Sequence, residues 1–210
     1  ARKNLISDNM SSLQGPALWA YNDATFSDTD FENIIKFGAG TKKEDASKVG
    51  RFGLGFNSVY NLTDVPSFIS RHTMAMFDPH VKYLKGGAGL KLDFTRQVNR
   101  ALLSKMSQQF KPYQGVFGCQ LKNSDDMFYD GTLFRFPFRT SEQATDSKIK
   151  QDSYGRSKRQ EFLKMLLERA GSLLLFTQSV KRVKVFYLPR DCTDPSSPKS
   201  LLDLTKTSHA

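Results

Sequence analysis

Residues that bind metals or form disulfides are scarce in this chain of 210 residues, which has two cysteines and three histidines. Cys119 and Cys192 stand far apart, and neither belongs to a C-x-x-C pair. The histidines are not grouped with cysteines or carboxylates at the spacing of metal ligands. This pattern excludes a disulfide framework and a zinc site and favours a reducing compartment. We therefore expect a cytoplasmic protein with no bound structural metal.

Long apolar runs are also missing. No stretch approaches the roughly 18 apolar residues that span a bilayer, and the mean hydropathy is −0.47. Residues 1–4 lack the apolar core of a signal peptide. The 39% of hydrophobic residues, with 17 phenylalanines, still provide for a sizeable core. We expect one domain over residues 1–188 and a tail over 189–210 whose prolines, Pro195 and Pro198, give it linker composition.

Acidic residues are outnumbered, which leaves a net charge of +10. Residues 148–190 contain eleven lysines and arginines but three acids. One interpretation is a surface for nucleic acid or an acidic partner. The other, which we favour, is a solvated helix face and strand edge with balancing acids elsewhere in a larger protein, because the aromatic residues there follow a pattern of burial. Nucleic acid is therefore an unlikely partner.

The hydrophobic pattern predicts an α+β fold. Ser27 and Asp30 are spaced as a capping box before a helix whose apolar face begins at Phe31. The polar residues 140–158 indicate a surface loop, Gly171 is expected to end a helix that begins at Arg159, and residues 173–176 are expected to be buried. Strands are expected at residues 17–21, 65–70, 73–78, 90–94, 131–139 and 183–187, and other helices before residue 60 and over 100–109.

One cluster of glycines precedes an expected helix. Gly50, Gly53 and Gly55 fall within six residues, interleaved with Arg51, Phe52, Leu54 and Phe56, just before an expected helix. Bare main-chain N–H groups at such a position can bind phosphate, and Arg51 adds a cation. The G-x-x-G-x-G spacing is neither a P-loop nor the dinucleotide fingerprint. A phosphate site and a plain turn both remain open on this motif alone.

Three segments together resemble the GHKL ATPase superfamily, which includes gyrase, MutL, histidine kinases and the ninety-kilodalton heat-shock chaperone. They are residues 19–27, the glycine run 50–56, and the pair Gly131-Thr132. More narrowly, residues 17–60 and the stretch 77–80 are similar to the repeated domains of the sacsin family of very large co-chaperone-like proteins. The resemblance implies a two-layer sandwich, with a mixed, mostly antiparallel sheet and helices packed on one face.

The resemblance also implies a nucleotide site. Asn22 or Asp23 would accept a hydrogen bond from the adenine amino group, Thr132 would support the adenine side, and residues 50–56 would face the phosphates. Two departures from the family pattern bear on this site. Ala24 and Thr25 stand where the family has two glycines, and residues 1–16 contain no Glu, so the first helix with its general base and magnesium-binding Asn has no counterpart.

Three functions are left open, two from the resemblance and the third from the basic residues 148–190. The first is a nucleotide-binding or scaffold domain that acts in protein folding and quality control. The second is an active magnesium-dependent ATPase, once the missing helix is supplied. The third is a basic nucleic-acid-binding domain. ATP or ADP with magnesium is the implied ligand, although the fold does not require it; the implied partners are chaperones, client proteins and neighbouring domains, without a membrane.

Arg135 is expected to be a buried cation. It alternates with Phe134 and Phe136 in an apolar strand. A charge buried without a partner costs stability, so this position should be sensitive to substitution.

Overall fold

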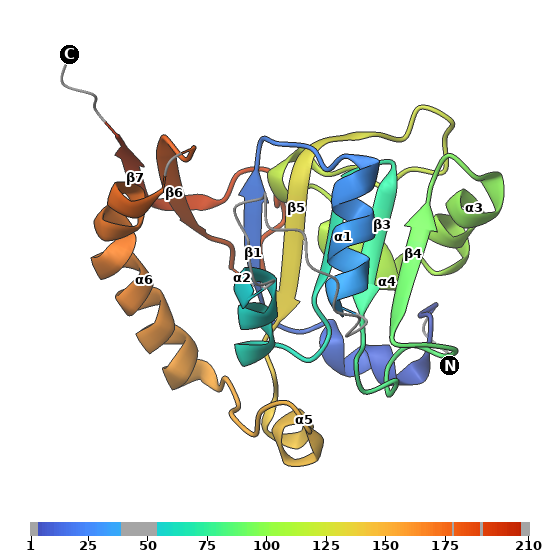
Figure 1. Cartoon of the computed structure of the whole chain (residues 1–210), viewed down its shortest axis with the longest axis horizontal. Coiled ribbons are helices and arrows are strands. Elements are labelled where there is room, and N and C mark those ends of the chain that lie inside the picture. Colours follow the sequence, from blue (N-terminus) through green and yellow to red (C-terminus); the bar gives the residue numbers. More distant parts are fainter. Residues whose placement is uncertain (1–3, 39–53, 178, 190, 207–210) are drawn as a thin grey trace. The chain divides into compact units, whose positions relative to one another are not determined.

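The computed structural model describes residues 4–38, 54–177, 179–189 and 191–206 (Figure 1). The chain forms two compact units, Ala1–Ser153 and Tyr154–Ala210. The sequence predicts one domain over 1–188 and a linker after it. The predicted linker contains strand β7 (Lys199–Thr205). This strand forms because its residues pair with a neighbouring strand of the second unit.

The first unit is built on a five-stranded sheet of order β1-β5-β2-β3-β4. Every neighbouring pair in it is antiparallel, so the sheet is not mixed as the family resemblance implied. The predicted strands are confirmed with small shifts at their ends. Their bounds are β1 Ala17–Asn22, β2 Ser67–Arg71, β3 Thr73–Phe77, β4 Gly89–Asp93 and β5 Tyr129–Pro137.

One face of the sheet carries phenylalanine and is covered by helix α1 (Asp28–Gly38) (Figure 1). Phe68 of β2 pairs with Phe134 of β5, and the ring of Phe31 from α1 stacks on Phe68 at 5.5 Å between centroids. The helix begins as predicted. The Oγ of Ser27 accepts from the N–H of Asp30 (3.2 Å), and the carboxylate of Asp30 accepts from the N–H of Ser27 (2.9 Å).

The opposite face is covered as well. Ser67 and Trp19, which alternate with the residues of the first face, contact Tyr113 through a 2.6 Å hydrogen bond and an edge-on ring contact. Helices therefore lie on both faces of the sheet rather than on one. The physical reason is that the second face is also apolar, with Ile69 and Leu133 fully buried. This cover is formed by η1 (Asp8–Leu13), α4 (Ser107–Phe110) and η3 (Lys111–Tyr113), next to α3 (Gln97–Lys105) and η4 (Val116–Gly118).

The remaining helices of this unit are short. α2 (Leu54–Asn57) and η2 (Ser58–Asn61) form the helical segment expected before residue 60. Helix α5 (Ser141–Asp146) lies in a segment that its polarity predicted to be a loop. Thr140 and Gln143 form a capping box there, and the T-x-x-Q spacing was the available sequence signal.

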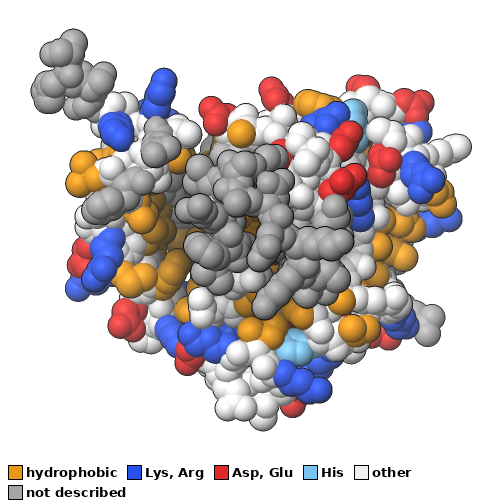
Figure 2. All heavy atoms as spheres, in the orientation of Figure 1, with side chains coloured by type: hydrophobic (Ala, Val, Ile, Leu, Met, Phe, Trp, Pro, Cys, Tyr) orange, Lys and Arg blue, Asp and Glu red, His pale blue; other side chains and the backbone are white. Residues whose placement is uncertain are grey.

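The second unit consists of helix α6 (Arg156–Phe176) and a hairpin of β6 (Arg182–Tyr187) and β7. Gly171 does not end α6, which continues for five more residues. Leu174 is buried, but Leu173 and Leu175 are exposed, because consecutive residues of a helix point in different directions. Figure 2 shows hydrophobic side chains at the surface along this helix. In the part of the chain that the structure describes, no helix has the length and apolar character needed to cross a membrane.

Candidate nucleotide site

The turn after β1 carries the two candidate adenine contacts, and the structure gives them different environments. Asn22 ends β1 opposite Thr132 of β5. Its side-chain oxygen accepts a hydrogen bond from the N–H of Ala24 (3.1 Å), which closes an Asx turn. Asp23 is exposed and has no hydrogen-bond or ion-pair partner among the described residues. Among the described residues, the carboxylate of Asp23 is thus unengaged, whereas the side-chain oxygen of Asn22 already accepts one hydrogen bond.

Two buried hydroxyls fasten this turn to the sheet. The Oγ1 of Thr132 donates to the carbonyl of Ala24 at 2.7 Å. The Oγ of Ser70 donates to the carbonyl of Gly131 at 2.7 Å and accepts from the N–H of Phe26 at 2.9 Å. Both side chains are fully buried, and their oxygens lie 3.0 Å apart. Thr132 thus has a structural partner on the adenine side of the predicted site.

Sequence reasoning did not identify Ser70. Its signal was a hydroxyl at the end of the apolar stretch Phe68-Ile69, on the strand face that Phe68 shares. A buried hydroxyl needs a hydrogen-bond partner. A hydroxyl at this position therefore indicates that a backbone segment crosses the end of the sheet beside Ser70.

Gly131 allows the two strands to approach closely at this point. Its φ is +122°, a conformation that residues with a Cβ rarely adopt. A Cβ there would lie 2.7 Å from Cε2 of Tyr21 and 2.8 Å from the carbonyl oxygen of Asn22. The glycine is therefore required by backbone geometry and space at the base of the turn.

The glycine run is only partly described. Gly50, Arg51, Phe52 and Gly53 lie outside the described residues, while Leu54, Gly55 and Phe56 are in α2. The ring of Phe56 contacts that of Phe77 at 5.3 Å between centroids. No heavy atom of the described residues would lie within 4 Å of a Cβ on Gly55.

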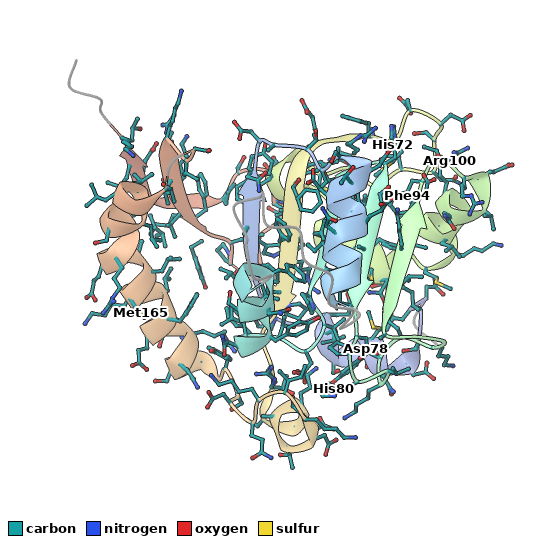
Figure 3. All side chains as sticks on the ribbon, in the orientation of Figure 1. His72, Asp78, His80, Phe94, Arg100 and Met165 are labelled. Carbon is teal, nitrogen blue, oxygen red and sulfur yellow. The ribbon has the colours of Figure 1, made fainter. Side chains whose placement is uncertain are left out.

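The two halves of the predicted site lie toward opposite ends of the same sheet face. Thr73 pairs with Ser70 beside Thr132, whereas Phe77, which Phe56 contacts, is four residues further along β3. This separation is roughly 13 Å along the strand. In Figure 3, His72 and Asp78, the residues just before and just after β3, mark these two ends.

The residues before β1 pack on the other face of the sheet. The side-chain amide of Asn9 donates to the carbonyl of Lys82 (2.8 Å), and the hydroxyl of Ser7 donates to the carbonyl of Tyr83 (2.5 Å). Met10 and Leu13 are buried beneath the sheet. The side chains of this segment are therefore directed away from the face that carries Phe68 and Phe134.

Two basic residues of the second unit, Arg182 and Lys184, share an acidic partner within that unit. Arg182 donates two hydrogen bonds to the carboxylate of Asp203 on β7, at 2.7 and 2.5 Å. Lys184 lies 3.6 Å from the same carboxylate. The hydrogen bond from Arg182 lowers the pKa of Asp203, and the same bond raises the pKa of Arg182. The acid that balances these two residues of the strand edge thus lies in the same hairpin, whereas the sequence interpretation placed the balancing acids elsewhere in a larger protein.

The fold and the turn define an α+β domain with a fixed acidic turn at the end of an antiparallel sheet. Residues 1–200 match the model of the Sacsin domain family. The chain is 39% identical to human sacsin over 215 residues, which cover 99% of this chain and 5% of that protein. The chain therefore belongs to the sacsin domain family. It spans about a twentieth of the length of human sacsin, which implies neighbouring domains in a much longer protein.

Proposed function

We propose that this chain is a nucleotide-binding domain of a large chaperone-related protein that acts in protein folding and quality control. Its ligand is ATP or ADP with magnesium. The observation that carries the proposal is the exposed carboxylate of Asp23, held at the end of a turn that Ser70 and Thr132 fasten to the sheet.

The chemistry of the turn suits an adenine base. A carboxylate accepts hydrogen bonds only, and the exocyclic amine of adenine donates them. Because Asn22 has its oxygen engaged with Ala24, Asp23 is the better acceptor of the two. Hydrogen bonds from Ser70, Thr132 and Asn22 hold the backbone of the turn in place, which reduces the ordering that binding would cost.

The phosphates extend along the sheet toward the glycine run. In this proposal, main-chain N–H groups of residues 50–55 bind them, and Arg51 contributes a positive charge. The separation of roughly 13 Å between the turn and the Phe56 end of the sheet is the distance that base, ribose and phosphates together must cover.

Hydrolysis is not part of the proposed function of this segment. Residues 1–16 contain no Glu to serve as a general base, and Asn9 is engaged with Lys82 on the other face. The nucleotide then acts as a ligand that stabilises one state of the domain, which neighbouring domains or client proteins recognise. Magnesium would supply charge neutralisation between the phosphates.

Calorimetric titration with magnesium-ATP and magnesium-GTP tests the proposal. The wild-type chain should bind ATP more tightly than GTP, because guanine presents a carbonyl to Asp23 where adenine presents an amine. Asp23→Ala should remove this preference, whereas Gly53→Val should weaken both nucleotides equally. Asp130→Ala is the matched control, since Asp130 is exposed on β5 near the same end of the sheet.

The outcomes separate the alternatives. Heat from neither nucleotide would refute nucleotide binding and leave a scaffold role for the phenylalanine-filled layer between α1 and the sheet. Binding that is unchanged in Asp23→Ala would refute the assignment of the base contact.

A further inference from the structure

A small cavity lies within the first unit, on the sheet face opposite to Phe68 and Phe134. It is lined by Arg135 and Ser67 of the sheet, by Gln109 and Tyr113 from the covering helices, and by apolar side chains that include Met10 and Met76. The room for the centre of a water molecule is about 10 Å³. This cavity is separate from the proposed nucleotide site, and its argument does not depend on nucleotide binding.

Two buried polar atoms on the residues lining this cavity have no hydrogen-bond partner among the described residues. They are Nε of Arg135, a donor, and Oε1 of Gln109, an acceptor. The two residues are 5% and 4% exposed. A donor and an acceptor that are both buried and both unpaired are each costly, and native structures rarely tolerate either one.

The rest of the Arg135 environment contains no counter-charge. Its Nη2 donates to the carbonyls of Leu13 (2.8 Å) and Gly15 (3.2 Å), and its guanidinium lies 5.5 Å from the ring centroid of Trp19. Arg135 forms no ion pair with any carboxylate in the described part of the chain. A guanidinium in such surroundings needs each of its N–H groups to reach an acceptor.

We propose that the cavity holds one ordered water molecule that bridges Arg135 and Gln109. The water accepts from Nε of Arg135 and donates to Oε1 of Gln109. The water donates its second hydrogen bond to a hydroxyl oxygen of the Ser67–Tyr113 pair, whose oxygens lie 2.6 Å apart. Buried waters typically have two to four polar partners and need about the volume found here. A phosphate or carboxylate ion is too large for this space.

The bridging water completes a continuous polar connection through the apolar side of the sheet. The contacts run from the carbonyls of Leu13 and Gly15, through the guanidinium of Arg135 on β5, to the water and then to Gln109 of α4. It explains how an uncompensated arginine is kept in a core position. It also links three segments that are far apart in the sequence.

Nuclear magnetic resonance on this chain with ¹⁵N-labelled arginine tests the proposal. The Hε signal of Arg135, assigned by its loss in Arg135→Lys, should show a rotating-frame cross-peak to water with the sign of a long-lived contact rather than of exchange. Gln109→Met should abolish this cross-peak because it removes the acceptor. Gln108→Met is the matched control, since Gln108 is the exposed neighbour on the same helix, and it should leave the cross-peak intact.

Either of two results overturns the proposal. One is a wild-type spectrum in which Hε of Arg135 contacts the Gln109 side chain directly and shows no water. The other is a water cross-peak that is undiminished in Gln109→Met. If Gln109→Met fails to fold, the wild-type spectrum alone decides.

Discussion

Arg139 and Asp64 form an ion pair that is closed to solvent. Nε and Nη2 of Arg139 lie 2.8 and 2.7 Å from the same oxygen of Asp64, and the side chains are 0% and 3% exposed. Two further hydrogen bonds join the pair, since Ser147 donates to the same oxygen of Asp64 (3.0 Å) and the carbonyl of Tyr60 accepts from Nη2 (2.7 Å). The pair thus ties the end of β5 to the segment before β2 and to the residue after α5.

Asp64→Asn should lower the free energy of unfolding by about 3–5 kcal/mol, because it leaves the guanidinium of Arg139 buried without a counter-charge. Urea denaturation followed by circular dichroism measures this loss. Asp146→Asn is the control, since Asp146 pairs with Lys82 on the surface and should leave the urea midpoint unchanged. The double variant Asp64→Leu/Arg139→Met should lose less than Asp64→Asn alone. Additive or greater loss in the double variant would contradict the argument.

Gly131→Ala should destabilise the first unit by about 2–3 kcal/mol, because the residue has φ +122° and a Cβ would collide with Tyr21 and the carbonyl of Asn22. Gly171→Ala is expected to raise stability instead. Gly171 lies inside α6 with open space around it, so alanine should stabilise by about 0.5–1 kcal/mol. Melting temperatures of the two variants check both. Equal effects in the same direction would show that Gly131 is not constrained.

The sequence predicted the elements of the first unit well, because their signals are local. The Ser27–Asp30 capping box corresponds directly to observed hydrogen bonds, and the predicted strand over 131–139 corresponds to β5, although both of its faces are buried. The second face of the sheet was not anticipated. Its cover comes from η1 and α4, which are short and have no clear periodicity. The length of α6 and the existence of β7 depend on contacts distant in sequence, which outweigh the local signals of glycine and proline.

The candidate site was predictable in part. The resemblance placed Asn22 and Asp23 at the end of a strand, and only hydrogen-bond geometry could separate their roles, because the Asx turn of Asn22 is not specific to a sequence spacing. Ser70 was missed because one serine in an apolar strand has many explanations. Arg135 was predicted to be buried, and this is confirmed at 5% exposure.

Tyr60→Phe should leave stability at neutral pH unchanged or slightly raised, because the hydroxyl of Tyr60 is buried with no partner among the described residues. Burial, together with the carboxylate of Asp78, raises the pKa of Tyr60 to about 12. The unfolded chain therefore ionises this tyrosine near pH 10, before the folded chain does. Its contribution to stability is fully present below pH 10 and declines as the pH rises toward 12. Tyr60→Phe should make the loss of stability over this window less steep.

Tyr113→Phe is the matched comparison for Tyr60→Phe. The hydroxyl of Tyr113 bonds Ser67 at 2.6 Å, so its removal should cost about 1–2 kcal/mol at neutral pH. Burial raises the pKa of Tyr113 as well, so Tyr113→Phe should also make the loss of stability at alkaline pH less steep. Urea denaturation at pH 8 and pH 11 measures both effects. A Tyr60→Phe variant that is as unstable as Tyr113→Phe at pH 8 would mean that the Tyr60 hydroxyl has a partner.

Arg135→Cys should destabilise the first unit by about 3 kcal/mol, because it removes the donor to the carbonyls of Leu13 and Gly15 and leaves a larger cavity. Burial lowers the pKa of Arg135 to about 10, which means that the folded state disfavours its charge at neutral pH. Arg135→Met removes the charge but retains most of the volume, so it should lose less stability than Arg135→Cys. Arg96→Cys, at an exposed position, is the control for the new thiol and should be neutral in reducing buffer. Differential scanning calorimetry ranks the three variants. An unchanged melting temperature for Arg135→Cys would show that neither the packing nor the carbonyl contacts of this arginine contribute to the stability of the sheet.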